Sequence, residues 1–384
     1  MINSFDFFLP TEIHFGNGVL GSLGAELIKR KAKRPLVVTD KSMKKTGLVD
    51  LVVNEISKTV MAYDIFDDTV PNPRDYDCDK GAKLALEKKS DVIVAIGGGS
   101  AMDTAKTIAT IMTNGKTAKD WFDVDLDVKS APVICIPTTC GTGSEVTYNA
   151  VITNSVTHLK ANIFDPKCAP VLALVDPNVI KSLPGFLVSS TGIDALTHAI
   201  EAHVCKIATP ITDAISTYAI TLIVDNIIAA ANDKDENALC NVMLASTMAG
   251  IAFGNADTAA VHCIAECFGG FYDIPHGVTN SIFLADVSEF SIPGNPKKYA
   301  EVAKAMGIDI SEMDDMEAAK SGVNKIRALC KELNIPSLKS FDAIDPKDFS
   351  YLAEASSHHC CNHNNPIEAT KEEYLAIFSK VYNA

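Results

Sequence analysis

The pattern of hydrophobic and polar positions divides the chain into two parts. In the first part, short apolar runs rich in β-branched residues alternate with longer stretches of helical character. The runs expected to be buried strands are Pro35–Thr39, Val92–Ile96 and Pro132–Pro137, and expected helices between them include Asp75–Lys89 and Met102–Thr113. Alternation of this kind predicts βαβ units and a mostly parallel sheet.

The second part, from about Ser189 onward, has a helical pattern and no convincing strand. Its first expected helices are Ser189–Cys205, Thr209–Asn232, Asp235–Asn255 and Thr258–Gly269. Pro184 and Gly185 interrupt the chain between the two parts. We therefore expect an α/β domain of the nucleotide-binding type at residues 1–184 and an all-helical domain at residues 185–384. A cleft between two such domains is a usual place for a ligand.

Composition argues against several classes of partner. The formal net charge of −14 opposes binding to nucleic acids and to anionic membrane surfaces. The longest apolar stretch, Ala219–Ala231, is interrupted by Asp225 and Asn226 and is too short to span a bilayer, and the N-terminus lacks the pattern of a signal peptide. Eleven cysteines without C-x-x-C spacing fit a reducing compartment. We expect a cytoplasmic protein with neither nucleic acid nor membrane as a partner.

A glycine turn follows the second expected strand. Gly97, Gly98 and Gly99 precede Ser100 and the start of a helix. A strand, a glycine turn and a helix N-terminus in this order make an anion site, because glycine lets the backbone approach a phosphate and the first N–H groups of the helix point at it. The spacing is not G-x-G-x-x-G, and a simple tight turn is the alternative.

A second polar loop follows the strand Pro132–Pro137. Its hydroxyl side chains can donate to a phosphate or a ribose, and they belong to Thr138, Thr139, Thr142 and Ser144. Loops at the carboxyl ends of neighbouring strands form the ligand crevice of open α/β sheets, so the two loops together predict a dinucleotide site; a Ser/Thr-rich surface loop is the alternative. Asp40 ends another strand, and its carboxylate would accept from a ribose 2′-hydroxyl but repel a 2′-phosphate, which favours NAD over NADP.

Four residues of the helical part offer metal ligands. Asp194 and His198 stand four positions apart in an expected helix, which puts both side chains on one face. His262 begins another expected helix, and His276 follows fourteen residues later. One carboxylate and three imidazoles would make a mixed nitrogen and oxygen site for a divalent first-row metal. Taken singly, each histidine is more often a hydrogen-bonded core residue than a ligand.

Together these stretches resemble the iron-containing alcohol dehydrogenase family, which includes lactaldehyde reductases, butanol dehydrogenases and 1,3-propanediol dehydrogenases. The resemblance extends over essentially the whole chain, in the segments Pro10–Gly18, Gly97–Lys106, Pro137–Glu145, Asp194–Glu201, Gly250–Asn255 and Gly269–Asn280. It implies a dehydroquinate-synthase-like fold with the site in the interdomain cleft. It also implies an oxidoreductase that transfers a hydride between NAD(H) and a short-chain primary alcohol, diol or aldehyde. The implied metal is Fe²⁺, with Zn²⁺ as the alternative, and the implied assembly is a homodimer.

The resemblance assigns roles to individual positions. The implied metal ligands are Asp194, His198, His262 and His276. The implied cofactor positions are Asp40, Asn72, Gly98, Gly99, Ser100, Asp103, Thr138, Thr139, Ser144 and Lys160. The patterns of the glycine turn and of the second polar loop add Gly97 and Thr142. Asn149 and Phe253 match positions beside the substrate. The metal would act as a Lewis acid on the substrate oxygen, and the cofactor would exchange the hydride.

Three positions depart from the family's pattern. Glu266 replaces a histidine that is common four residues after the third metal ligand, Cys267 replaces a proline, and Asp257 replaces a glycine. Glu266 adds negative charge near the metal. It would either accept a proton or strengthen metal binding by contacting the groups around the ligands. Our hypothesis is that Glu266 shifts the pH dependence of the reaction, and a tolerated substitution is the alternative.

The segment Ser357–His363 gathers histidines and cysteines near the C-terminus. These neighbouring side chains are not expected all to converge on one ion, and the segment has no C-x-x-C or H-x-x-H spacing. The resemblance places Cys361 near the cleft, where its thiol would be reactive, and Ile367 stands where the family usually has an arginine.

Two other functions stay open at this point. A carbon–oxygen lyase of the dehydroquinate synthase type would need a basic pocket, and the segments named above offer few Lys or Arg residues. The second alternative is a catalytically weakened binding homologue, in which Glu266 would reflect the loss of activity. The retention of all four implied metal ligands argues against it.

Overall fold

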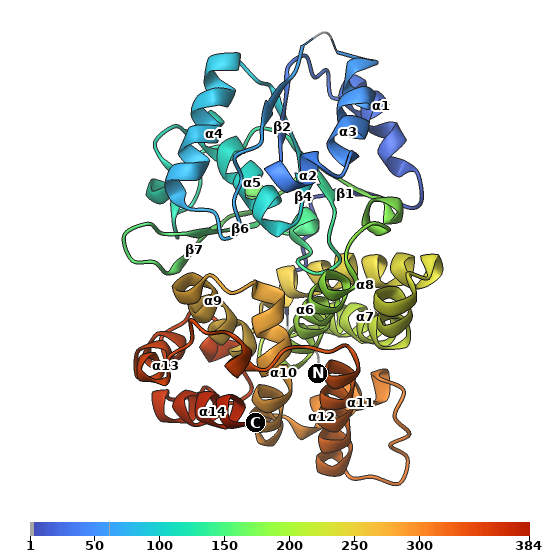
Figure 1. Ribbon diagram of the computed structural model, residues 1–384, viewed down its shortest axis with the longest axis vertical. Coiled ribbons are helices and arrows are strands. Elements are labelled where there is room, and N and C mark those ends of the chain that lie inside the picture. Colours follow the sequence, from blue (N-terminus) through green and yellow to red (C-terminus); the bar gives the residue numbers. More distant parts are fainter. Residues whose placement is uncertain (1–3, 61) are drawn as a thin grey trace. The chain divides into compact units, whose positions relative to one another are not determined.

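The computed structural model describes residues 4–60 and 62–384, which form two compact units (Figure 1). The α/β unit is Leu9–Leu183. The helical unit is Pro184–Ala384 together with the start of the chain up to Phe8. An α/β unit followed by an all-helical unit is the fold class that the sequence predicted, and it is confirmed.

The α/β unit is built on one parallel sheet of six strands. In sheet order these are β1 (Glu12–Phe15), β8 (Leu172–Val175), β5 (Val133–Pro137), β4 (Val92–Gly97), β2 (Pro35–Val38) and β3 (Asp64–Phe66). The strands β2, β4, β5 and β8 are buried along their whole length, as expected for a parallel sheet that is covered on both faces. A separate antiparallel pair, which the sequence analysis missed, joins β6 (Asn149–Thr153) to β7 (Lys160–Phe164).

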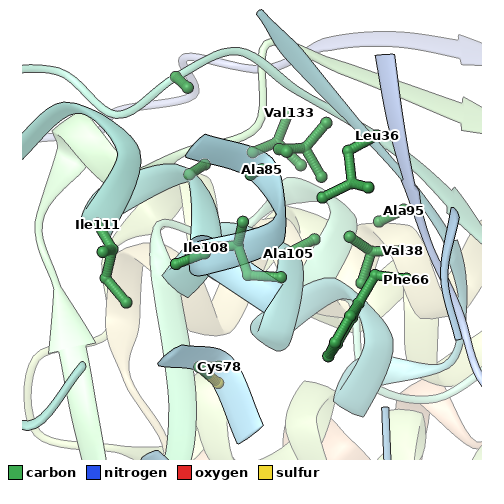
Figure 2. Close-up of a cluster of buried hydrophobic side chains, with 14 of the residues drawn as sticks. Leu36, Val38, Phe66, Cys78, Ala85, Ala95, Ala105, Ile108, Ile111 and Val133 are labelled. Atoms are coloured by element: carbon green, nitrogen blue, oxygen red, sulfur yellow. The ribbon is translucent and has the colours of Figure 1, made fainter. Parts of the chain in front are cut away.

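Five α-helices of the described chain belong to this unit: α1 (Leu23–Lys29), α2 (Lys41–Lys44), α3 (Leu48–Ser57), α4 (Asp75–Lys88) and α5 (Gly99–Asn114). Side chains of α4 and α5 form a core with the sheet, shown in Figure 2. Ile108 of α5 is fully buried there, and burial of such a side chain contributes about 2 kcal/mol. A Cβ at Gly81 would lie 2.3 Å from Ile108 Cδ1, so glycine is what lets α4 approach α5.

The helical unit contains α6 (Gly185–Val204), α7 (Pro210–Ile228), α8 (Glu236–Ala256), α9 (Ala260–Tyr272), α10 (His276–Ser291), α11 (Pro296–Ala305), α12 (Asp315–Glu332), α13 (Phe349–Ser357) and α14 (Lys371–Asn383). Its central helix is α6, which packs against α7, α8 and α10 and is buried along most of its length. A helix buried on all sides is expected to be apolar all round. The polar side chains that α6 nevertheless carries therefore need partners.

Within the described residues, two helices are long and apolar enough to cross a bilayer, by length and composition alone. They are Pro210–Asp233, which is α7 with a π-helical extension, and α8. The expectation that no segment has this property was wrong, because Asp225 and Asn226 interrupt the apolar run without ending the helix. Core helices meet the same criterion, and α7 and α8 pack against each other and against α6.

Candidate functional site

Four side chains of the helical unit converge on one point. Asp194 and His198 lie on α6, His262 lies on α9, and His276 is the first residue of α10. The candidate ligand atoms of these four residues all lie within 4.8 Å of one another. The structure therefore brings together the four residues that the sequence singled out.

The amide of Asn280, one turn after His276 on α10, marks the point of convergence. Its Nδ2 lies 2.6 Å from Asp194 Oδ1, 3.2 Å from His262 Nε2 and 3.1 Å from His276 Nε2. The lone pairs of one carboxylate and two imidazoles thus face the same place, which is what a cation requires. Sequence reasoning missed Asn280, although its spacing of four from His276 places both on one face of the helix.

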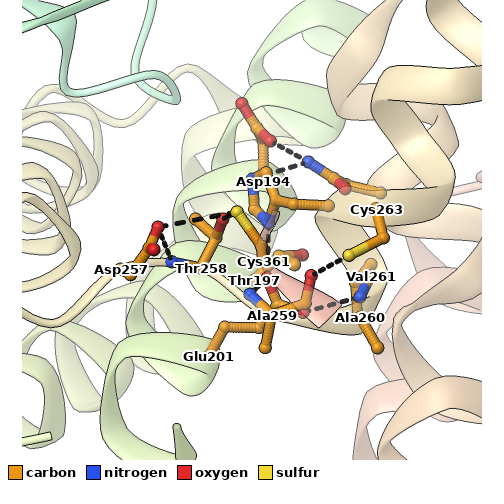
Figure 3. Close-up of polar contacts among 12 residues, drawn as sticks. Asp194, Thr197, Glu201, Asp257, Thr258, Ala259, Ala260, Val261, Cys263 and Cys361 are labelled. Carbon is orange, nitrogen blue, oxygen red and sulfur yellow. Dashed lines mark hydrogen bonds and ion pairs between the residues drawn. The ribbon is translucent and has the colours of Figure 1, made fainter. Parts of the chain in front are cut away.

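A second carboxylate fixes the orientation of His262. Glu201 Oε2 lies 2.5 Å from His262 Nδ1, and the same side chain accepts from the backbone N–H of Ala259 at 3.0 Å and of Val261 at 2.7 Å (Figure 3). This contact puts the imidazole hydrogen on Nδ1 and leaves the Nε2 lone pair for the cluster. Glu201 was also missed, although it lies on α6 seven residues after Asp194 and so on the same face.

Three members of the cluster are buried, His276 is partly exposed, and the surroundings favour the ionised form of the Asp194 carboxylate. Burial raises the pKa of Asp194, but the three imidazoles and the amide of Asn280 outweigh burial and hold that pKa below its usual value. In His262, burial lowers the pKa of the imidazole and the Glu201 carboxylate more than offsets it, so the net shift is upward. The arrangement therefore presents one negative oxygen among three imidazoles.

Two neighbours shape the cluster. The ring of Phe253 on α8 stacks on the His198 imidazole, with centroids 4.3 Å apart and an angle of 17° between the planes. A Cβ at Gly277 would lie 2.7 Å from Ser190 O and 3.2 Å from Asp194 Cβ, so this glycine lets α10 begin against α6. Phe253, for which the resemblance implies a position beside the substrate, thus lies against a candidate metal ligand.

Glu266, one turn after His262 on α9, is paired with a distant residue. Its Oε2 lies 2.9 Å from Nε2 of His359, which follows α13. Burial raises the pKa of Glu266, but the contact with His359 outweighs burial and lowers that pKa to about 2. The carboxylate is therefore charged near neutral pH. This favours a role in contacting the groups around the metal ligands over a role as a proton acceptor. The hypothesis that Glu266 shifts the pH dependence stays a prediction.

Three of the five histidine and cysteine side chains after α13 lie close together, whereas His358 and His363 are not in the group. Ligand atoms of His359, Cys360 and Cys361 lie within 4.8 Å of one another. These residues form a turn, not a helix or strand, so adjacent side chains can point to the same side. The pKa of the exposed Cys360 thiol is lowered to about 5, first by the Cys361 thiol and then by His359.

In the α/β unit, the glycine turn and the threonine loop lie side by side. They follow β4 and β5, which are paired, and Thr138 donates its backbone N–H to Gly97 O at 3.0 Å. A Cβ at Gly99 would lie 2.8 Å from Thr142 Cγ2, so the two loops are too close for a larger residue there. The predicted adjacency of the two loops is confirmed.

The edge formed by these loops suits a phosphate or a hydroxyl group. Gly98 precedes α5 in an extended conformation, and Gly99 and Ser100 form its first turn, where backbone N–H groups point outward. Among the described residues, the buried hydroxyls of Thr138 and Thr139 have no hydrogen-bond partner. Buried polar groups normally have one, so these hydroxyls offer contacts to a ligand.

Asp40 lies beside the same glycine turn. Its Oδ1 caps α2 by accepting from the backbone N–H of Ser42 at 2.8 Å and of Met43 at 2.9 Å. Its Oδ2 would lie 3.9 Å from a Cβ at Gly97. One oxygen of the carboxylate is therefore committed to the cap, and the other faces the turn.

Asp103 and Ser144 belong to a network around a buried lysine. Lys106 Nζ lies 2.7 Å from Ser144 Oγ, 3.4 Å from Asp103 Oδ1 and 2.6 Å from the backbone oxygen of Asn149, and Ser144 Oγ donates to Asp103 Oδ1 at 2.7 Å. Lys106 is completely buried, and a buried charge needs such partners. The network connects α5 to the threonine loop and to the start of β6. Lys106 was missed, although it stands three residues after Asp103 on the same helix.

The remaining two predicted cofactor residues contact each other. Asn72 has a φ of 49°, and its Oδ1 accepts from Lys160 Nζ at 2.8 Å. This contact joins the loop before α4 to the first residue of β7. It positions one amide and one ammonium group within the α/β unit.

Known proteins resemble this chain along its whole length. The family model described as iron-containing alcohol dehydrogenase matches residues 10–177, and a model of the C-terminal part of Fe-containing alcohol dehydrogenases matches residues 188–382. Alcohol dehydrogenase 4 of Saccharomyces cerevisiae is 37% identical over 380 residues, which is 98% of each chain. The NAD-dependent methanol dehydrogenase of Bacillus methanolicus is 35% identical over 374 residues, covering 97% of this chain and 98% of that one. The crystal structure of a 1,3-propanediol oxidoreductase matches with a TM-score of 0.95 and 33% identity, covering 99% of this chain and 100% of that one.

Proposed function

Because this chain belongs to the iron-containing alcohol dehydrogenase family, we propose that it transfers a hydride between NAD(H) and a short-chain primary alcohol, diol or aldehyde. We propose that Asp194, His198, His262 and His276 hold the divalent metal, with Fe²⁺ as the ion. The observation that carries the proposal is that four ligand atoms from three helices lie within 4.8 Å of one another.

The residues of the cluster fit such an ion. Three imidazoles and a carboxylate suit divalent first-row metals, and Zn²⁺ would bind at least as tightly as Fe²⁺, so occupancy depends on supply. When bound, the metal supplies a Lewis acid for a substrate oxygen, and NAD(H) supplies or accepts the hydride. Asp194 contributes the negative charge of the site. Glu201 orients the His262 imidazole by accepting the hydrogen bond from His262 Nδ1.

Phe253 supports a preference for small substrates. Its ring covers the face of His198, so an apolar surface lies directly beside the proposed metal ligands. A short alkyl chain would gain from contact with this surface because its burial removes apolar area from water. We propose that Asn149 and Glu266 also influence the reaction, Glu266 through its pairing with His359.

The α/β unit would hold the cofactor at the carboxyl ends of β2, β4 and β5. The first turn of α5 would receive the pyrophosphate, and the hydroxyls of Thr138 and Thr139 would donate to it or to a ribose. The carboxylate of Asp40 beside Gly97 would repel a 2′-phosphate. These features support NAD rather than NADP.

We further propose a cytoplasmic homodimer with domains at residues 1–184 and 185–384 and no nucleic-acid or membrane partner. The net charge of −14 supports the absence of a nucleic-acid partner. Light scattering of the purified protein tests the dimer, since a mass equal to one chain would contradict it.

Anaerobic oxidation of NADH with a panel of short aldehydes tests the function. Protein stripped with a chelator should be inactive, and Fe²⁺ should restore its activity. His276→Ala should stay inactive, whereas His14→Ala should behave as wild type; both side chains are 31% exposed, so the two variants are matched in burial. Activity that is independent of added metal, or no turnover of any aldehyde, would overturn the proposal.

A further inference from the structure

The turn after α13 brings an imidazole and two thiols together. In this group, which we call the 359–361 cluster, Cys360 Sγ lies 3.7 Å from Cys361 Sγ and 3.9 Å from His359 Nδ1. Cys360 is exposed, and Cys361 is buried. The described part of the helical unit thus contains a second cluster of metal-ligating groups, which consists of two thiols and one imidazole.

A fourth ligating group lies next to this cluster. Asp257 Oδ1 is 3.6 Å from Cys361 Sγ, and Thr258 Oγ1 donates to the same sulfur at 3.3 Å (Figure 3). The second oxygen of Asp257 accepts from Asn364 Nδ2 at 2.7 Å. Asp257 has a φ of 80°, which is unfavourable for any residue with a Cβ. Strain of this kind is typical of functional positions.

Three of the six separations among these ligand atoms are close to those of tetrahedral coordination, and Asp257, which lies outside the group of atoms within 4.8 Å of one another, would move toward the ion. With metal–sulfur bonds of about 2.3 Å and metal–oxygen bonds of about 2.1 Å, two sulfur ligands lie about 3.8 Å apart, and a sulfur and an oxygen ligand lie about 3.6 Å apart. The separations of Cys361 Sγ from Cys360 Sγ and from Asp257 Oδ1 are 3.7 Å and 3.6 Å. The separation of 3.9 Å between Cys360 Sγ and His359 Nδ1 is slightly longer than the value of about 3.6 Å for sulfur and nitrogen.

The imidazole of His359 is oriented as a metal ligand. Its Nε2 contacts the Glu266 carboxylate at 2.9 Å, and its Nδ1 accepts from the backbone N–H of Cys361 at 3.3 Å. The hydrogen therefore lies on Nε2, and the Nδ1 lone pair, which accepts from the Cys361 N–H, would turn to the ion when one binds. Histidine ligands of metals commonly donate their other N–H to a carboxylate in this way.

Two of the departures from the family's pattern meet at this cluster. Glu266 stands where a histidine is common and orients His359, and Asp257 stands where a glycine is usual and contacts Cys361. Both changes place a carboxylate against the same three residues. A site at this place would account for both.

We propose that His359, Cys360, Cys361 and Asp257 form a second metal site, for a thiophilic divalent cation of the Zn²⁺ class. Soft thiolate ligands select such ions, whereas the nitrogen and oxygen ligands of the first cluster also suit Fe²⁺. Binding forms two metal–sulfur bonds and releases the thiol protons to solvent, with no change of oxidation state. With four protein ligands the site is closed, as structural zinc sites are, and it fastens the turn after α13 to the end of α8.

A disulfide between the two cysteines fits the geometry less well. The Cα atoms of adjacent residues are about 3.8 Å apart, whereas those of disulfides are usually about 4.4–6.8 Å apart. A bridging ion keeps the sulfurs at the observed separation, while a disulfide would have to bring them to about 2.0 Å.

Titration of the reduced, metal-free full-length protein with Cd²⁺ tests the proposal. Cd²⁺ bound to thiolate gives a charge-transfer band in the ultraviolet, to which the first cluster cannot contribute because it has no sulfur. The wild type should show this band, with the final amplitude of one thiolate-bound Cd²⁺ per chain once the first cluster is filled as well. Cys360→Ser should weaken the band and the binding, and the double variant Cys360→Ser/Cys361→Ser should abolish the band.

Matched variants separate this site from other thiols and from the first cluster. Cys240→Ser removes a partly exposed thiol elsewhere, and Asp194→Asn changes the first cluster; both should keep the full band. Asp257→Gly removes a proposed ligand. The backbone at this position has a φ of 80°, which glycine adopts without steric strain, so the substitution is not expected to impair folding. It should weaken Cd²⁺ binding, and Glu266→Gln should weaken it by about 10- to 100-fold.

Several results would overturn the proposal. These are the absence of the band in the wild type, a full band in the double cysteine variant, or equal Cd²⁺ affinity in Asp257→Gly and the wild type. Mass spectrometry that finds a Cys360–Cys361 disulfide, together with no Cd²⁺ uptake after its reduction, would likewise reject a metal site in favour of a redox pair.

Discussion

His359 and Glu266 form a partly buried contact between segments 93 residues apart, with Nε2 of the imidazole 2.9 Å from Oε2 of the carboxylate. The resemblance to the family would place a histidine at position 266, and this chain instead has a carboxylate there. The imidazole beside α9 is thus supplied by the turn after α13. The pairing explains how a charged residue is accommodated at this position.

Removal of the Glu266 charge should destabilise the helical unit. Both side chains of the pair are 13% exposed, so Glu266→Gln leaves an imidazole with no carboxylate partner in a largely buried place. We expect a loss of about 3 kcal/mol in the free energy of unfolding, measured with urea at pH 7. Glu354→Gln breaks an exposed pair with Lys371 and should cost less than about 1 kcal/mol. Equal effects of the two variants would contradict the role of the pair.

Glu201→Gln should weaken metal binding at the first cluster. The glutamine keeps the shape of the side chain but removes the carboxylate that fixes the Nδ1 hydrogen of His262. We expect affinity for Fe²⁺ or Zn²⁺ to fall about 10- to 100-fold in competition with a chelator. Glu301→Gln is the matched control, because Glu301 contacts His203 outside the cluster at 3.1 Å. Unchanged affinity in Glu201→Gln would show that this contact does not orient a ligand.

Asp40→Asn should shift the cofactor preference toward NADPH. Asparagine caps a helix as well as aspartate does, so α2 is retained while the negative charge beside Gly97 is lost. Two unit charges about 4 Å apart repel by about 1 kcal/mol in water, so the ratio of kcat/KM for NADPH to that for NADH should rise about fivefold. Asp67→Asn, which breaks an ion pair with Lys44, should leave the ratio unchanged. A constant ratio in Asp40→Asn would place the 2′-hydroxyl elsewhere.

Glu289 should make stability depend on pH on the acid side. Hydrogen bonds from Lys380 of α14 and then Arg327 of α12 lower the pKa of this carboxyl on α10 below its usual 4.5. The folded protein therefore binds this proton less readily than the unfolded chain, so the contribution is full above about pH 4.5 and is lost as the pH falls toward the lowered pKa.

The difference in unfolding free energy between the wild type and Glu289→Gln tests this effect. It should be largest above about pH 4.5 and shrink below it, and added salt should reduce it because the pair is partly exposed. Glu312→Gln, which removes an exposed carboxylate outside this network, serves as the control. A difference that grows as the pH falls would have the wrong sign.

The sequence predicted what depends on local geometry. The spacing of Asp194 and His198 placed both on one helical face, and the strand followed by Gly97–Gly99 predicted a turn before a helix; the structure has both. It did not predict contacts that depend on tertiary packing. The pairing of Glu266 with His359 and the burial of Lys106 against Ser144 join segments far apart in the chain. Asn280 and Glu201 had the right helical spacing, but only the packing of α6, α9 and α10 shows that they face the cluster.

X-ray absorption at the iron edge tests the proposed metal centre most directly. Protein reconstituted anaerobically with one equivalent of Fe²⁺ should show nitrogen and oxygen neighbours, the outer-shell scattering of imidazole, and no sulfur. The double variant Asp194→Asn/His276→Ala should lose that signal. Sulfur in the first shell, or a spectrum that the double variant leaves unchanged, would contradict the assignment of the metal to Asp194, His198, His262 and His276.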